Sequence, residues 1–349
     1  SARGLYRAFD AGLVERIAAN VRPGAVGDVV TSWPVSSEVS LPWGAGFDDS
    51  RVWVSDPELL NNHLFTPAGA HTGSIFSTPW VGAWNGDMAW DPNRNLMWQV
   101  NVGGDNGIYA LDPATGAVVM SITSGIWTSV SQRGLAYDAD TDTFYIGGWN
   151  EDIIYKVAGP SYSNPGDVLD AWSFPVSIAG LAWHPDGILW VTTNSAPDMI
   201  YALDLEALAV VHQVPHPFGG DYSGAGLALN SDGNLWVTSM KDNYVYLVNT
   251  EMPLAKGIEV EPKRGTVEAG LTQELTVTID AAALGEPGSV VEQHLVITTN
   301  DPENPQLYVD LIITIEPGPT IVEASAEPTI GEPPLTVAFA AEVEPGAAE

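Results

Sequence analysis

Cysteine is absent from this chain of 349 residues. That absence excludes disulfide bonds, thiolate-ligated zinc, iron–sulfur clusters and cysteine nucleophiles. No apolar run approaches the roughly 20 residues that span a bilayer as a helix, so we expect no membrane insertion. Apolar residues still make up 45% of the chain, which is enough to build a core and argues against general disorder.

Basic residues are scarce. Lysine and arginine together number 12 against 44 acidic residues, which gives a formal net charge of −32. Such a charge repels phosphate groups, so we expect no nucleic-acid partner and no docking on anionic membranes. The acidity suits a calcium-rich or salty exterior, and we expect a secreted, extracellular, monomeric protein.

Tryptophan is missing from the C-terminal part of the chain. All 13 tryptophans lie between Trp33 and Trp236, and the residues beyond about position 250 are rich in Val, Thr, Glu and Pro. The segment Thr250–Pro253 is typical of a linker, so we expect a domain boundary there.

A short phrase recurs five times before that boundary, and its copies begin 43, 47, 46 and 46 residues apart. Each copy is followed by a polar turn and two further segments of apolar and aromatic residues, and the first four copies have a fourth such segment. Four short strands repeated every ~45 residues are typical of the blades of a β-propeller. The copies are Gly44–Asp48, Asp87–Asp91, Gly134–Asp138, Gly180–His184 and Gly226–Asn230.

The fifth repeat lacks a fourth strand, because the linker follows Val248 directly. A substitute stands upstream, where Asp28–Pro34 resembles the fourth-strand segment Asp167–Pro175. We therefore predict an all-β chain in which residues 26–250 form a five-bladed β-propeller closed by an N-terminal strand. Residues 1–25 are expected to be a helix or linker, because apolar residues recur at i, i+4 spacing from Leu5 to Ile17.

Alternating apolar segments return beyond the linker, between turn-forming clusters such as Asn300–Pro305. They predict that residues 251–317 form an antiparallel, immunoglobulin-like β-sandwich. Residues 318–349 are predicted to begin an incomplete third β module.

Several stretches resemble known families. The segment 258–317 resembles bacterial immunoglobulin-like domains of the Hydin type, through Gly265–Gly270 and Thr298–Pro302. The segment Ala324–Val337 is similar to the opening of a polycystic-kidney-disease-type repeat, whose later Trp and Gly-Asp-Gly elements are missing. The propeller repeats resemble those downstream of the catalytic domain in secreted subtilisin-like peptidases, and loosely those of streptogramin lyases and gluconolactonases. The resemblance implies that this chain is a C-terminal accessory region. The sequence itself supplies no subtilase Asp, His or Ser motif.

Calcium is the one cofactor that the sequence suggests. Asp138, Asp140 and Asp142 stand at every second position, a spacing that could wrap a calcium ion with oxygens. They also fall where other repeats have hairpin turns, in which Asp and Asn bond their own backbone.

Two histidines lie four residues apart, at His212 and His216. Pro215 argues against the helix that would align them as metal ligands. We therefore expect ordinary surface or edge histidines.

Polar and aromatic residues gather in the loops before the first strands and between the second and third strands. Blade geometry places both loop sets on one face, around the mouth of the channel. Aromatic rings beside amides and carboxylates suit a sugar or a peptide, although repeated Asn and Asp also close turns. Arg133 could pair with a ligand carboxylate or with Asp87. Because carboxylates prevail there, we expect an uncharged or cationic ligand. The candidate ligand-binding residues are Trp43, Asp87, Arg133, Trp149, Asn150, Glu151, Asn194 and Asp242.

The sequence favours a non-catalytic binding or spacer region of a secreted modular bacterial protein, a peptidase being one candidate, with carbohydrate, protein or peptide contacts at the mouth. The alternative is an enzyme at the mouth, either a lyase or a glycan-acting hydrolase. It would need a positioned acid–base pair, for which Asp87 with Glu151 is the candidate. A structural stalk is a third alternative, because fold does not decide function.

Overall fold

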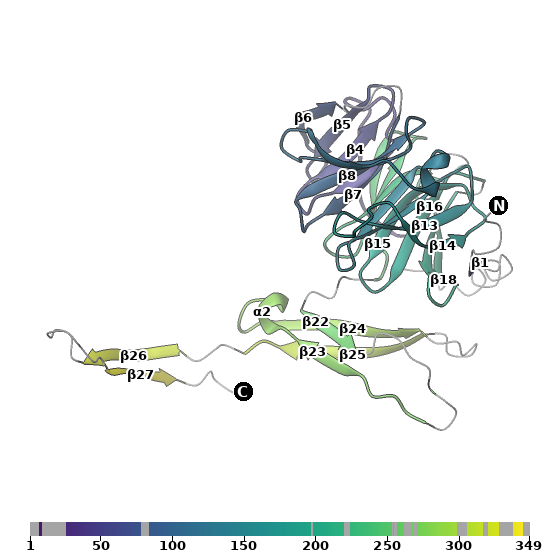
Figure 1. Ribbon diagram of the computed structural model, residues 1–349. Helices are drawn as coiled ribbons and strands as arrows, with labels where there is room; N and C mark the ends of the chain where they lie inside the picture. Colours follow the sequence, from purple (N-terminus) through teal and green to yellow (C-terminus); the bar gives the residue numbers. More distant parts are fainter. Residues whose placement is uncertain are drawn as a thin grey trace. The chain divides into compact units, whose positions relative to one another are not determined.

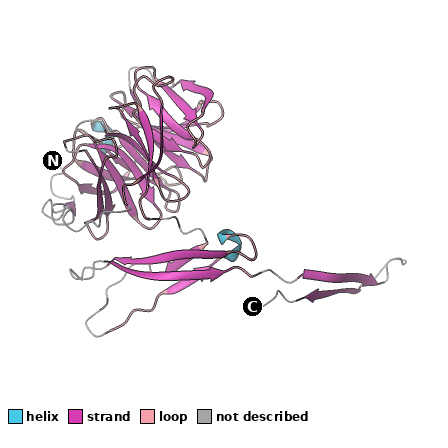
Figure 2. Cartoon of the chain, turned by 180° about the vertical axis from the view of Figure 1, so that it is seen from behind, coloured by secondary structure: helices cyan, strands magenta, loops and turns pink. Residues whose placement is uncertain are grey.

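The chain divides into two compact units, Ser1–Leu254 and Ala255–Glu349. Among the described residues, strands dominate both units and helix is confined to short segments (Figures 1 and 2). The computed structural model describes residues 7–8, 26–77, 84–196, 198–219, 224–252, 254, 257–261, 267, 271–298, 306–316, 320–327 and 338–344.

The first unit is a five-bladed β-propeller, as predicted. Each blade is an antiparallel sheet of four strands paired in sequence order, except that the fifth blade takes its outermost strand from the N-terminal side. The first strands of the five blades contact one another in a closed ring, in the order β3, β7, β11, β15 and β19. Blade 1 comprises β3 (Ala45–Phe47), β4 (Val52–Asp56), β5 (Asn61–Phe65) and β6 (His71–Ser77); blade 2 comprises β7 (Trp84–Asp91), β8 (Leu96–Val102), β9 (Ile108–Leu111) and β10 (Val118–Ile122); blade 3 comprises β11 (Gly134–Asp138), β12 (Thr143–Gly147), β13 (Ile153–Ala158) and β14 (Val168–Ser173); blade 4 comprises β15 (Ile178–His184), β16 (Ile188–Thr193), β17 (Met199–Asp204) and β18 (Ala209–Pro215); blade 5 comprises β19 (Gly224–Leu229), β20 (Leu235–Ser239), β21 (Tyr244–Val248) and β2 (Val29–Pro34).

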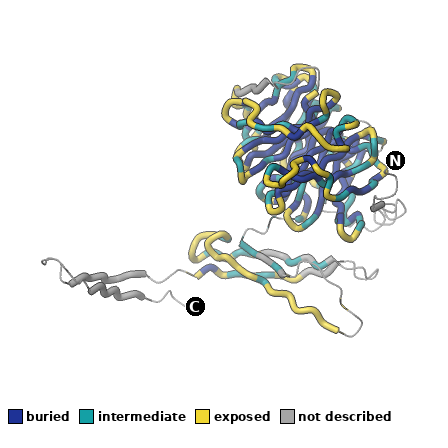
Figure 3. Tube along the Cα trace, viewed as in Figure 1, coloured by how far each residue is buried: buried dark blue, intermediate teal, exposed yellow. Residues whose placement is uncertain are grey.

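The core lies between neighbouring blades. Both faces of each inner and second strand are covered, so these strands are buried at nearly every residue (Figure 3). Large aromatic side chains fill the space between sheets. The tryptophans buried to at least 99% are Trp53, Trp98, Trp127, Trp190 and Trp236.

The ring closes through β2, which pairs antiparallel with β21, the last strand of the fifth repeat. Trp33 of β2 is buried, and its ring lies 4.9 Å from that of Phe65 and 6.1 Å from that of Trp236. The predicted N-terminal closing strand is therefore confirmed.

The predicted N-terminal helix is wrong at the two residues of that segment that the structure describes. Arg7 and Ala8 form a short strand, β1, which pairs parallel to Trp172 and Ser173 at the edge of blade 3. An edge strand with free N–H and C=O groups attracts extended chain. The rest of the predicted helix lies outside the described residues.

Four of the five first strands begin their repeat with glycine, and these glycines let the strands converge on the axis. A Cβ atom on Gly226 would lie 2.0 Å from Ala45 N, and one on Gly44 would lie 2.1 Å from Gly86 O. A Cβ on Gly180 would lie 2.7 Å from Leu227 N. Because the obstacles are backbone atoms, no side chain can move aside.

Gly226→Ala is therefore expected to lower the free energy of unfolding by about 3 kcal/mol, the upper end of the usual cost of overpacking, because the backbone it meets cannot move aside. The matched control is Gly73→Ala. Gly73 has a φ of 77° and no atom within 4 Å of an added Cβ, so its cost of about 1 kcal/mol comes from the backbone alone. Urea melts compare the two, and equal losses would contradict the close approach at the axis.

The described residues of the second unit form three two-stranded antiparallel sheets. They are β22 (Ile258–Glu261) with β23 (Thr276–Ile279), β24 (Val290–Thr298) with β25 (Gln306–Thr314), and β26 (Thr320–Glu327) with β27 (Ala338–Glu344). A one-turn helix, α2 (Ala281–Leu284), is capped by Asp280. The immunoglobulin-like and third-module assignments stay predictions. Within the described residues, no helix is both long and apolar enough to cross a bilayer.

Candidate functional site

Asp87 lies where the five first strands meet. It occupies the position that is glycine in the other four repeats, so its side chain enters the space that those glycines leave. One carboxylate oxygen accepts the backbone N–H groups of Ala45 (3.0 Å) and Leu227 (3.2 Å). The other accepts those of Leu181 (2.9 Å) and Leu135 (3.4 Å). One side chain therefore ties its own blade to the other four.

The electrostatics of Asp87 follow from this position. Only 1% of the residue is exposed, and burial raises the pKa of its carboxyl group to about 8, while the four amide donors oppose that rise. Because both oxygens are fully used, the carboxylate closes the channel at its own level. A ligand can reach Asp87 from neither side without breaking these hydrogen bonds.

The loops that were expected to surround the mouth do lie together. Asn106, between the second and third strands of blade 2, donates to Thr128 O (2.9 Å), which precedes the first strand of blade 3. Asn194 likewise donates to Gly224 O (2.6 Å) at the start of blade 5. Lys241 Nζ donates to Gly219 O (2.8 Å). These bonds join the two loop sets on one face, which we call the mouth.

Arg133 crosses the mouth. It comes from blade 3, yet its Nη2 reaches Gly224 O (3.5 Å) and Met240 Sδ (3.6 Å) in blade 5. Its guanidinium carbon lies 4.3 Å from the ring centre of Trp43, in blade 1, in a cation–π arrangement. Within the described part of the chain, Nε and Nη1 donate to no acceptor, and only 4% of the residue is exposed.

This buried cation has no direct counter-ion among the described residues. Burial lowers the pKa of Arg133 to about 9, and the charges of Asp87 and Asp198 oppose that shift without touching the guanidinium. Asp87 is bonded to amides, and Asp198 accepts Gly224 N (2.7 Å). A charged group that is desolvated and incompletely hydrogen-bonded favours an added partner.

A histidine that was expected at the surface or at a sheet edge is buried next to Gly224, whose carbonyl oxygen Arg133 contacts. Only 4% of His216 is exposed, which corrects the expectation for this residue. Its Nε2 lies 2.7 Å from Thr192 Oγ1, and its Nδ1 lies 3.7 Å from Asp198 Oδ2. Burial lowers the pKa of His216 to about 4, so the ring is neutral near pH 7. Pro215 is the last residue of β18, and His216 follows it directly.

Several carboxylates counted at the mouth are bonded to tyrosines four residues later. Tyr155 donates to Glu151 (2.7 Å), Tyr246 donates to Asp242 (2.6 Å), and Tyr109 donates to Asp105. The pairing repeats in three blades. These carboxylates therefore stabilise the loops between the second and third strands.

Three tryptophans from three blades lie at the mouth, and Trp43 is the one in contact with Arg133. Trp43 is partly buried beneath the guanidinium, and the ring of Trp84 meets it edge-on at 5.9 Å. Trp84 is 58% exposed, and Trp149 is 48% exposed. Arg133 N donates to Gly147 O, which places its strand beside the Trp149 loop. Asn150 is exposed and makes a long bond to Ser131 O (3.4 Å), so it lies on the rim.

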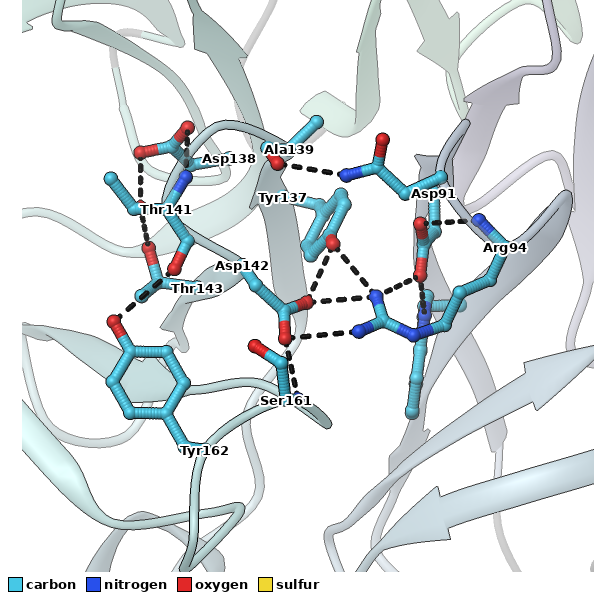
Figure 4. Close-up of polar contacts among 12 residues, drawn as sticks. Asp91, Arg94, Tyr137, Asp138, Ala139, Thr141, Asp142, Thr143, Ser161 and Tyr162 are labelled. Atoms are coloured by element: carbon cyan, nitrogen blue, oxygen red, sulfur yellow. Dashed lines mark hydrogen bonds and ion pairs between the residues drawn. The ribbon is translucent and has the colours of Figure 1, made fainter.

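Two of the three carboxylates of the predicted calcium site, those of Asp138 and Asp142, are engaged elsewhere (Figure 4). Asp138 accepts Thr141 Oγ1 (2.6 Å) and closes a turn, while Asp140 is exposed. Asp142 accepts two bonds from Arg94, at 2.8 and 3.1 Å. Although burial opposes it, the bonds from Arg94 and its neighbours lower the pKa of Asp142 to about 2. Within the described ranges, no group of three acidic or histidine side chains is arranged to hold a metal ion.

Arg94 instead links two blades at that turn. It also bonds Asp91 (2.9 Å) and Tyr137 (3.0 Å), so blade 2 is tied to blade 3 (Figure 4).

A cavity of about 230 Å³ lies at the opposite end of the axis from Arg133. Its walls are the C-terminal ends of the first strands, including Ala89, Ala136 and Ala182, and its rim is formed by the hairpin turns that follow. Asp87 therefore lies between this cavity and the mouth, which contains the buried cation.

Comparison with solved structures finds propellers. The chain is similar to the glutaminyl cyclase of Myxococcus xanthus, with a TM-score of 0.51 and 12% sequence identity over 65% of this chain and 98% of that chain. It is also similar to the WD40 β-propeller domain of Doa1, with a TM-score of 0.41 and 16% identity over 60% of this chain and 63% of that chain. The first likeness shows a shared fold and no more. No family model and no curated protein matches the sequence.

Sequence reasoning named Arg133, Trp43 and Asn194 and missed Trp84, Thr192, Asp198 and His216. The four missed residues could have been found from their position in the repeat, because each stands at the mouth end of a strand or in a mouth loop. The recurring phrase shows where those strand ends lie.

Proposed function

We propose that the propeller is a non-catalytic ligand-binding module of a secreted, modular bacterial protein, and that its ligand binds at the mouth. The observation that carries this proposal is Arg133. A guanidinium that is 96% buried, stacked on Trp43 and left with free donors among the described residues has the properties of a recognition group.

The surroundings of Arg133 support a carbohydrate or a peptide as the ligand. Trp84 and Trp149 present exposed indole rings, which stack on sugar rings or apolar side chains. Exposed aromatic side chains beside a buried polar anchor are typical of binding sites.

The modular setting rests on the family resemblances. Residues 258–317 resemble a Hydin-type immunoglobulin-like domain, and Ala324–Val337 resembles the start of a polycystic-kidney-disease-type repeat. Together with the propeller repeats, they support an accessory region of a secreted peptidase. Calcium stays a candidate cofactor of such a setting, without a site among the residues described here.

The enzyme alternative is less well supported by the contacts. Asp87, its candidate acid or base, is enclosed by four amides, and Glu151 is bonded to Tyr155. General acid–base catalysis needs both groups within reach of one substrate.

The test is an array of neutral, amino and uronic-acid glycans together with peptides, probed with the 349-residue chain. Wild type should retain at least one ligand class that Trp84→Ala and Trp149→Ala lose, because both side chains are exposed and their removal spares the fold. Tyr162→Ala is the control, since Tyr162 is an exposed aromatic residue that bonds Thr141 at the far end of blade 3. Equal binding by all four proteins would contradict a ligand site at the mouth.

A further inference from the structure

The charged side chains at the mouth differ in how many of their donors and acceptors are already used in hydrogen bonds. Carboxylates outnumber cations there, but Glu151 and Asp242 already accept tyrosine hydroxyls. Lys241 already donates to Gly219 O. These hydrogen bonds leave the charges in place but occupy the groups. Among the described mouth residues, Arg133 differs because its guanidinium is buried while its Nε and Nη1 donate to no described acceptor.

A carboxylate is the group that matches this cation. The planar guanidinium offers parallel N–H donors, and a carboxylate accepts two of them at once. A neutral carbonyl or hydroxyl would leave the positive charge without a counter-ion in a desolvated site.

Three further features limit the shape and charge of the ligand. Asp87 closes the channel behind the mouth, so a chain cannot thread through, and only an end group can reach the guanidinium. The net charge of −32 repels polyanions, which argues for one carboxylate rather than many. The flat, exposed ring of Trp84 next to Trp43 favours a sugar ring over a flexible peptide side chain.

We propose that the mouth binds a sugar end group that carries a single carboxylate, of the uronic-acid type, with the carboxylate on Arg133 and the sugar ring against Trp84. This inference rests on the proposed function, because it names the ligand class of the same site. It replaces the expectation of an uncharged or cationic ligand with a specific alternative.

The experiment compares two sugars that differ only in the carboxylate, methyl β-D-glucuronide and methyl β-D-glucoside, titrated into the full chain by NMR. Wild type should bind the glucuronide at least about 10-fold more tightly, since a charge-assisted bidentate bond is worth that much. Arg133→Met keeps the apolar stem and should abolish the difference while leaving the glucoside unchanged. Trp84→Ala should weaken both sugars.

A second measurement does not depend on a buried substitution. Sodium acetate should compete with the glucuronide on wild type and leave glucoside binding unaffected.

Asp221→Asn tests whether the acidic residue nearest to Gly224 in sequence supplies the counter-ion of Arg133. A 10-fold gain in glucuronide affinity in this variant would overturn the proposal.

The outcomes separate the two proposals. Equal affinities for the two sugars, both lost in Trp84→Ala, would overturn the carboxylate and keep the mouth as a binding site. Tighter binding of N-acetylphenylalanine than of the glucuronide would overturn the sugar and favour a peptide terminus. Absence of binding to these probes, combined with array ligands that ignore Trp84, would overturn both.

Discussion

Asp87→Asn is expected to lower the free energy of unfolding of the propeller by about 2–6 kcal/mol. Each side-chain oxygen of Asp87 accepts two backbone N–H groups, and the group is protonated below a pH of about 8. An amide nitrogen cannot accept, so two buried N–H groups lose their partner at about 1–3 kcal/mol each. Urea unfolding followed by tryptophan fluorescence measures the loss, because all the tryptophans precede residue 237.

The loss in free energy of unfolding caused by Asp87→Asn should also depend on pH. Burial raises the pKa of Asp87 to about 8 in the folded chain, above its ordinary value of 3.8. The folded state then binds the proton more tightly than the unfolded state, so this group's contribution is greatest below pH 3.8 and is lost as the pH rises through 8. The difference between wild type and Asp87→Asn should be smaller at pH 9 than at pH 6. Asp140→Asn, at an exposed turn, is the control and should show no such trend.

Deletion of residues 1–35 should abolish cooperative melting of the propeller. It removes β2, which pairs with β21 from Val29 to Pro34, and it removes the buried ring of Trp33. Blade 5 would then have an open edge, and an open sheet edge pairs with other chains. Calorimetry should show a broad or absent transition, and light scattering should show aggregation.

The control is deletion of residues 1–25, which leaves β2 in place. That chain should keep its cooperative transition and should not aggregate. If both truncated chains show the same sharp melting transition, β2 does not close the ring.

The propeller could be predicted because its signal is repeated five times. Small residues at the axis and bulky ones between blades recur at the same offsets, since every blade faces the same packing constraints. The closing strand was visible because Asp28–Pro34 resembles a fourth strand for which the fifth repeat has none of its own. The N-terminal helix failed at Arg7 and Ala8, where pairing with blade 3 prevails over an i, i+4 pattern.

The site was less accessible to sequence reasoning, because it depends on which charges are already paired. Asp87 looks like a ligand-binding carboxylate in the sequence, whereas its bonds to four amides make it the link between blades. The one feature of the sequence that indicates this linking role is that Asp87 stands where the other four repeats have glycine. Glu151 and Asp242 are each followed at four residues by a tyrosine, a pattern whose meaning appears only when the loop is folded. His216 was judged on its spacing from His212, although that spacing does not determine its burial.

A crystal structure of the chain with a ligand retained on the array tests the central claim most directly. The ligand should occupy the mouth, with an acceptor atom within hydrogen-bond distance of the Arg133 guanidinium and a ring against Trp84. A ligand bound in the cavity beyond Asp87, or on the second unit, with Arg133 left as it is here, would contradict the account.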